Sequence, residues 1–179
     1  DGNKVSFKNP VQSREAGIAC VYQELNIVKQ LSVTDNVFMG RSIKKGLLLD
    51  YAKMHEESRR ALTSLGHPEI DVKMECGKLG VGLQQMVEIA KAVSLDAKLI
   101  IMDEPSANLD YGNRTRVMQT VRSLAREGYT IIQSTHDPDQ AFLYSDQILA
   151  LYDGKILANG TPRDTITSDL ICALYGVDV

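Results

Sequence analysis

The chain has 179 residues, of which 44% are hydrophobic and 24% are charged, and this composition excludes a disordered or fibrous protein. Its net charge of −3 gives no basic surface overall, so no nucleic-acid partner is expected. The longest purely apolar runs, such as 47–49 and 99–102, are far shorter than the roughly 20 residues of a membrane-spanning helix. No signal peptide is recognisable, which favours a cytoplasmic location.

The first half of the chain is predicted to contain one strand followed mainly by helices. Residues 18–22 (IACVY) form an apolar, β-branched run typical of a buried strand. A helical stretch is expected from Leu31, because residues 32–36 offer side-chain oxygens that cap a helix start. Residues 50–65 place apolar side chains at helical spacing between charges, which predicts an amphipathic helix. A further helix is expected over 84–93, after a glycine-containing loop.

In the second half, strand and helix patterns alternate. Strands are predicted at 99–102, 129–133 and 147–152, with helices at 114–127 and 139–144. Asp153-Gly154 predicts a tight hairpin turn into a strand at 155–158, because this pair tolerates the positive φ angles of such a turn. Alternation of this kind favours a mainly parallel sheet with helices on its faces. Residues 30–95 show almost no strand pattern and are interpreted as a helical subdomain inserted into that α/β core.

Two carboxylates follow the most apolar strand. Asp103 and Glu104 end the run LIIMDE, and open α/β sheets bind ligands beyond the carboxyl ends of their strands. At such an edge Asp103 can hold magnesium through water, and Glu104 can orient or deprotonate an attacking water molecule. Alone, the same two residues would equally fit a solvated turn.

Two further polar residues are expected at the same edge. His136 follows the strand at 129–133 and can hydrogen-bond a γ-phosphate, whereas Gln23 follows the strand at 18–22 and its neutral amide can reach metal and water. Each would pass as an ordinary loop residue if the two acids were absent. A third segment, residues 79–85, opens a helix with Gly80, Gly82 and Gln84, and its backbone N–H groups and helix dipole favour an anion.

The order of these motifs resembles that of ABC-transporter ATPases over essentially the whole chain. The resemblance implies a P-loop NTPase-like (RecA-like) α/β core, residues 1–29 and 96–179, with a helical subdomain at 30–95. It identifies Gln23 as the Q-loop glutamine and His136 as the switch histidine. Asp103 and Glu104 match the Walker B aspartate and the catalytic glutamate.

The resemblance also implies ligands and partners. ATP and Mg²⁺ are the expected cofactors, and the signature loop, with Gly80, Gly82 and Gln84, would reach the ATP held by a second ATPase domain. Asp110 belongs to the segment ANLD that matches the D-loop at that dimer interface. Residues 23–45 would dock on transmembrane permease subunits, which a solute-binding protein supplies, and this places the chain at the cytoplasmic face of the membrane as a peripheral subunit.

Two departures from the family pattern affect the expected activity. No GxxxxGK[ST] phosphate loop occurs in the sequence, so the chain is expected to begin after that loop, to lack the strands before it and to bind ATP poorly as it stands. Gly80 replaces the usual serine of the signature, which removes a hydroxyl donor and is expected to slow hydrolysis.

The two halves of the chain resemble different importers. Residues 5–96 resemble ATPases of ribose- and galactose-type sugar importers, whereas the sequence from Ala107 onward resembles ATPases of iron-siderophore, haem and cobalamin importers. A sugar is favoured as the solute, because the first half contains the segment that meets the membrane partner. The alternatives are a metal-chelate importer and a catalytically inactive fragment or regulatory nucleotide-binding protein.

Overall fold

The computed structural model of the protein describes residues 4–177. The chain divides between Ser134 and Thr135 into two compact units.

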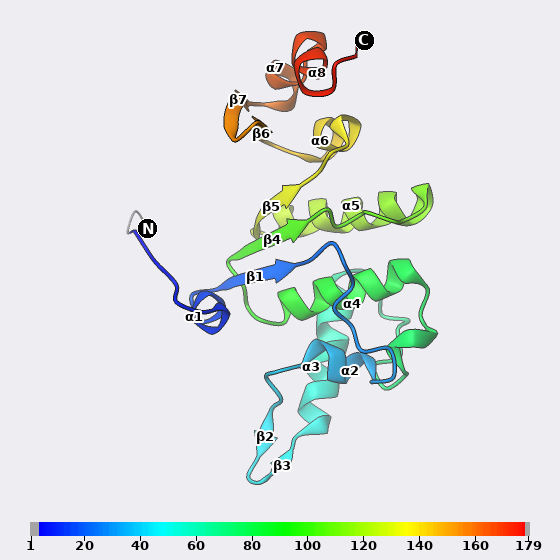
Figure 1. Cartoon of the computed structure of the whole chain (residues 1–179). Helices are drawn as coiled ribbons and strands as arrows, with labels where there is room; N and C mark the ends of the chain where they lie inside the picture. Colours follow the sequence, from blue (N-terminus) through cyan, green and yellow to red (C-terminus); the bar gives the residue numbers. More distant parts are fainter. Residues whose placement is uncertain (1–3, 178–179) are drawn as a thin grey trace. The chain divides into compact units, whose positions relative to one another are not determined.

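A three-stranded parallel sheet forms the centre of the first unit (Figure 1). Its strands are β1 (Ile18–Val21), β4 (Leu99–Asp103) and β5 (Thr130–Ser134), in the order β1-β4-β5. The three strands predicted at 18–22, 99–102 and 129–133 are therefore confirmed, each within one or two residues. Because parallel strands end at the same edge, the residues that follow β1, β4 and β5 leave the sheet on one side.

One face of this sheet is buried and the other is not. Ile100 and Met102 are buried, and their side chains point to the face that also carries Ala19 and Val21 of β1. On the opposite face, Ile101 is 38% exposed and Ile132 is 56% exposed. Within residues 4–134, one face of this sheet is therefore covered and the other is partly exposed, because alternate side chains on a strand point to opposite faces.

Two long helices pack against the buried face of the sheet. Helix α4 (Val81–Val93) contacts β1 and α5, and α5 (Tyr111–Arg126) contacts β5. The helix predicted from Arg114 begins three residues earlier, at Tyr111, because the side chain of Asp110 accepts a hydrogen bond from the Asn113 N–H and caps the helix there. Gly128 follows the end of α5 with φ +104°, as a terminating glycine should.

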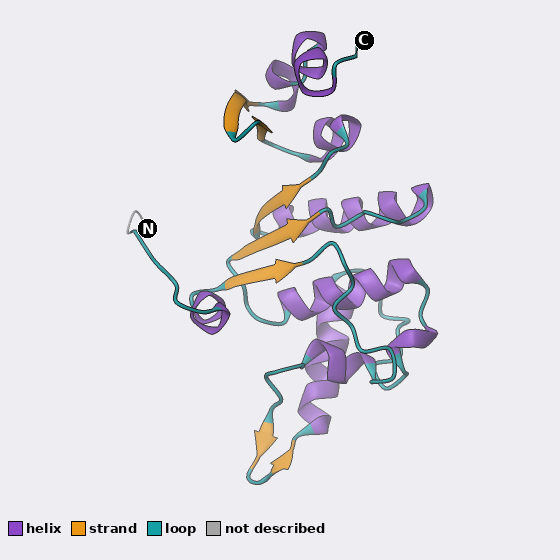
Figure 2. Ribbon diagram, viewed as in Figure 1, coloured by secondary structure: helices purple, strands orange, loops and turns teal. Residues whose placement is uncertain are grey.

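The segment 30–95 is mainly helical, as predicted (Figure 2). It contains α2 (Val33–Val37), α3 (Tyr51–Ser64), a 3-10 turn (Cys76–Lys78) and α4. Ser32 caps α2 and Asp50 caps α3, each through its side-chain oxygen. One expectation is corrected: residues 44–49 form an antiparallel hairpin of β2 (Lys44–Lys45) and β3 (Leu48–Leu49), which a pattern of two residues per strand is too short to reveal.

The remaining elements complete the two units. Helix α1 (Pro10–Glu15) precedes β1 in the first unit. The second unit holds α6 (Pro138–Tyr144), β6 (Ile148–Tyr152), β7 (Lys155–Gly160), α7 (Pro162–Thr165) and α8 (Ser168–Tyr175). Strands β6 and β7 pair antiparallel across Asp153-Gly154, whose φ angles of +47° and +70° confirm the predicted tight turn. Within residues 4–177, no helix is both long and apolar enough to span a bilayer.

A group of polar atoms is buried in the helical segment of the first unit. Ser58 of α3 and Gln85 and Glu88 of α4 are each at most 5% exposed. Among the described residues, Ser58 Oγ, Gln85 Nε2 and Glu88 Oε1 have no hydrogen-bond partner. Burial raises the pKa of Glu88, an effect that the nearby charge of Lys91 only partly opposes. Burial, and then the Glu88 carboxylate, also raise the pKa of the Cys76 thiol to about 11.

Glu88→Gln is expected to stabilise the fold at neutral pH and to flatten the dependence of its stability on pH. Because the folded pKa of Glu88 lies above the unfolded one, the folded chain binds this proton more tightly, and stability falls as pH rises between the two values. Glutamine keeps the shape without the buried charge, so a gain on the order of 1 kcal/mol is expected at about pH 8 and less at about pH 5. Urea unfolding at both pH values measures the difference. The exposed Glu56→Gln is the control, and equal gains at both pH values would contradict the assignment to Glu88.

Candidate functional site

The carboxyl ends of β4 and β5 hold the first pair of site residues together. Asp103 is the last residue of β4 and lies opposite Ser134, the last residue of β5. The Ser134 hydroxyl donates a hydrogen bond to Asp103 Oδ1 at 2.6 Å, and Ser134 Oγ accepts one from the Glu104 N–H at 3.0 Å. Ser134 therefore orients the Asp103 carboxylate and fixes the backbone of Glu104.

Glu104 stands in a strained turn directly after β4. Its φ of +40° lies in the left-handed region, which residues with a Cβ rarely adopt, and such outliers gather at functional sites. The Ala107 N–H closes the turn by donating to the Glu104 carbonyl at 2.9 Å. Glu104 as a whole residue is half-buried.

Gln23 reaches the same place from β1. Its side-chain Nε2 lies 3.5 Å from Glu104 Oε2, which is the long end of the range for a hydrogen bond. Gln23, Asp103 and Glu104 thus lie at one sheet edge, where the sequence placed them. The arrangement provides two carboxylates and one amide, all oxygen-bearing groups of the kind that bind magnesium.

The glycine-containing loop before α4 is shaped by its own backbone and by Gln84. Gly80 is the N-cap of α4 and provides no side-chain cap. Gln84 is 5% exposed, and its side-chain Nε2 donates to the Leu79 carbonyl at 2.7 Å. In this chain Gln84 therefore holds the loop in shape, and its predicted contact with a nucleotide stays a prediction.

Gly82 is required by the close approach of α4 to α5. A Cβ at Gly82 would lie 2.6 Å from Asn113 Oδ1 and 2.8 Å from its Cγ, whereas one at Gly80 would meet nothing within 4 Å. Asn113 cannot move freely, because its Nδ2 donates to Asp110 Oδ2 at 2.7 Å. These hydrogen bonds from Asn113 hold the pKa of Asp110 below its usual range. Asp110, predicted at a dimer interface, thus caps α5 and anchors the residue that packs on the glycine loop.

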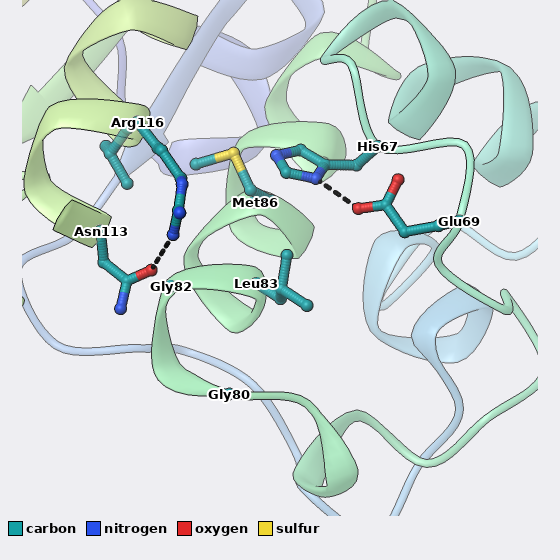
Figure 3. Close-up of a pocket in the computed structure, with 9 residues that line it drawn as sticks. His67, Glu69, Gly80, Gly82, Leu83, Met86, Asn113 and Arg116 are labelled. Atoms are coloured by element: carbon teal, nitrogen blue, oxygen red, sulfur yellow. Dashed lines mark hydrogen bonds and ion pairs between the residues drawn. The ribbon is translucent and has the colours of Figure 1, made fainter.

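A pocket of about 400 Å³ opens beside this loop (Figure 3). Its lining comes from the loop and first turn of α4, from α5 and from the segment after α3: His67, Glu69, Gly80, Gly82, Leu83, Met86, Asn113, Arg116 and Val117. His67 Nδ1 lies 2.8 Å from Glu69 Oε1, and this hydrogen bond lowers the pKa of Glu69. The loop with Gly80 therefore borders an accessible hollow rather than packed core.

His136 belongs to the second unit and lies two residues after Ser134 along the chain. It is exposed, and its backbone carbonyl accepts a hydrogen bond of 2.8 Å from the hydroxyl of Tyr175 in α8. Its predicted contact with a γ-phosphate stays a prediction.

Two residues of this region were missing from the sequence-based site. Ser134 could have been predicted from the sequence, because the parallel register places the last residue of β5 beside the last residue of β4. Asn113 could not have been predicted, because its role depends on how closely α4 and α5 approach each other, and no local sequence pattern encodes that distance.

The sequence profile of the family described as ABC transporter matches residues 1–107. A ribose import ATP-binding protein of Chromobacterium violaceum is 41% identical over all 179 residues, which span 36% of that protein. A galactose/methyl galactoside import ATP-binding protein of Clostridium perfringens is 36% identical over 97% of the chain and 33% of its own length. The chain thus spans about a third of the length of these curated relatives.

A solved structure shares the fold over most of the chain. It is described as a metal-chelate type ABC transporter in an inward-facing conformation, and it superposes with a TM-score of 0.79 at 29% identity. The match covers 90% of this chain and 64% of that one.

Proposed function

Because the chain belongs to the ABC transporter family, we propose that it binds and hydrolyses ATP as a subunit of an importer and couples hydrolysis to the uptake of a small solute, a sugar. The observation that carries the proposal is the gathering of Gln23, Asp103 and Glu104 at one edge of the β1-β4-β5 sheet. Ser134 supports it by holding Asp103 and Glu104 in fixed positions.

The residues at this edge fit magnesium and a nucleotide. Magnesium usually takes one or two protein carboxylates and completes its shell with water and substrate phosphates. Within residues 4–177, no group of three or more His, Cys, Asp or Glu side chains could hold a metal, so the phosphates would have to supply part of the shell. Asp103 and Gln23 would hold the ion. When bound, magnesium neutralises charge that develops on the phosphates.

Each residue then has a defined task. Glu104 accepts a proton from the attacking water, and its half-buried position favours that role over simple solvation. Gln23 orients water and the Glu104 carboxylate, and His136 contacts the γ-phosphate. The loop with Gly80 and Gly82 presents backbone N–H groups to the nucleotide of a second ATPase domain, and Asp110 supports that interface through Asn113.

The names of the relatives favour a sugar as the solute. The ribose and galactose import proteins match at 41% and 36% identity, in each case across nearly all of the chain. A metal chelate is the second candidate, because the 29% identical structure is described as of metal-chelate type and the sequence after Ala107 resembles such importers. Permease subunits and a solute-binding protein would complete the transporter at the cytoplasmic face of the membrane. Gly80 favours a third candidate, a nucleotide-binding protein with slow or no turnover.

Asp103→Asn tests the proposal in a protein that joins these 179 residues to an upstream segment with a GxxxxGK[ST] loop, called here the joined protein. ATP hydrolysis is expected to fall about 100-fold or more and to require more magnesium, because the amide cannot replace the carboxylate charge beside the ion. Steady-state ATPase rates over a magnesium titration provide the measurement. Asp71→Asn, an exposed residue outside the site, is the control. An unchanged magnesium requirement in Asp103→Asn would overturn the assignment.

A further inference from the structure

The hairpin at residues 44–49 exposes three consecutive leucines. Leu47 in the turn is 102% exposed, Leu48 77% and Leu49 43%. Leucine is among the residues most often buried, and a contiguous apolar patch on a surface marks an interaction site more often than chance. Tyr51, at the start of α3, is 44% exposed, and its hydroxyl donates a hydrogen bond to Asp35 Oδ1 at 3.2 Å.

The backbone of residues 43–50 is paired as a hairpin. Lys44 pairs with Leu49 and Lys45 with Leu48, and the Asp50 N–H donates to the Ile43 carbonyl at 2.8 Å below these pairs. Gly46 turns the chain with φ +65°, the conformation that a two-residue hairpin turn needs at its first position. The strand runs directly into α3, whose N-cap is Asp50. Leu47 therefore lies in the turn, and Leu48 and Leu49 form β3 of this hairpin, whose strands are labelled in Figure 1.

The charge of the hairpin is positive, although the chain as a whole carries −3. Residues 41–49 contain Arg41, Lys44 and Lys45 and no carboxylate. Arg41 is turned inward, where it donates to the Ser94 carbonyl at 3.1 Å and stacks over Phe38 at 4.4 Å. Within residues 4–177, Lys44 and Lys45 are exposed and take part in no ion pair. Both lysines are thus available to an external anion.

The exposed leucines 47–49 together with Lys44 and Lys45 indicate which kind of partner this hairpin binds. A nucleic acid would use the lysines and leave the leucines in water. An interface between lipid and water takes both, because leucines enter the acyl region while lysines stay among anionic headgroups. We propose that the 44–49 hairpin docks on an anionic lipid surface and inserts Leu47 and Leu48 into it. This contact uses no nucleotide chemistry, and at Lys44 and Lys45 it overlaps the segment 23–45 that is expected to dock on permease subunits.

Vesicle co-sedimentation tests the proposal. The wild-type chain is expected to bind vesicles of phosphatidylcholine mixed with phosphatidylglycerol, and to bind phosphatidylcholine alone more weakly. The double variant Lys44→Glu/Lys45→Glu is expected to lose at least about 25-fold in affinity for the anionic vesicles, about fivefold per lysine. Leu47→Ser/Leu48→Ser is expected to lose about tenfold or more on both kinds of vesicle. Leu143→Ser, a leucine 68% exposed in α6, is the matched control and should bind like the wild type.

A fluorescence measurement distinguishes insertion from loose adsorption. The chain contains no tryptophan, so Leu48→Trp adds a single reporter at the hairpin. Its emission should shift to shorter wavelength when anionic vesicles are added, whereas that of Leu143→Trp should not. Wild-type vesicle binding by both double variants would overturn the proposal. The proposal would also be overturned if either double variant bound vesicles like the wild type but failed to assemble on permease subunits. That result would assign the leucines and lysines of the hairpin to a protein partner.

Discussion

Replacing Glu104 with glutamine is expected to lower ATP hydrolysis by the joined protein about 100-fold or more and to leave ATP binding intact. A carboxylate that accepts a proton from the attacking water contributes roughly 100- to 10,000-fold to a rate. Glutamine occupies the same volume and can still face Gln23, which lies 3.5 Å from Glu104 Oε2, but it cannot accept the proton. The strained backbone at φ +40° is held by Ser134 and by the turn, and neither changes in the variant.

Two measurements made together decide the role of Glu104. Single-turnover hydrolysis reports the chemical step, and equilibrium binding of labelled ATP reports the site. Glu56→Gln makes the same chemical change on the exposed side of α3 and should leave both unchanged. Loss of binding together with hydrolysis would assign Glu104 to holding the nucleotide, and an unchanged rate would remove it from the mechanism.

Much of the sheet, and the edge that carries Gln23, Asp103 and Glu104, was predictable because the relevant signals are local. The run LIIMDE contains both the strand β4 and the two acids that follow it, and Gln23 follows β1 in the same way. Parallel pairing then brings these ends to one edge without any further information. Helix caps were equally local: Ser32 and Asp50 start their helices with their own side chains.

The parts that sequence reasoning missed depend on distances between elements. The exposure of Ile101 and Ile132 reflects which face of the sheet α4 and α5 cover, and an apolar strand looks the same in either case. The 44–49 hairpin has strands of two residues, which are too short for an alternating pattern to be recognised. A side chain would find open space at Gly80 but would collide with Asn113 of α5 at Gly82, and this difference depends on where α5 lies.

That difference between the two glycines leads to the second large effect: Gly80→Ser is expected to raise ATP turnover by the joined protein up to about 100-fold. A single hydroxyl donor directed at transition-state charge is worth roughly 100- to 1,000-fold in turnover when it is removed. A Cβ at Gly80 meets nothing within 4 Å, so the new side chain fits without displacing a neighbour. Serine at an N-cap position also favours helix formation, so α4 should not be weakened.

Gly80→Ala separates the effect of the serine hydroxyl from the effect of the added Cβ. Gly82→Ala tests whether a Cβ fits between Gly82 and Asn113. Alanine at position 80 adds the same Cβ without a donor, so its turnover should stay near that of the wild type. Alanine at position 82 must displace Asn113 from its bond with Asp110, so both stability and turnover should fall. Steady-state ATPase rates and urea unfolding of the three variants provide the measurements. An equal rise in Gly80→Ser and Gly80→Ala would mean that backbone stiffness, and not a missing donor, limits the wild-type loop.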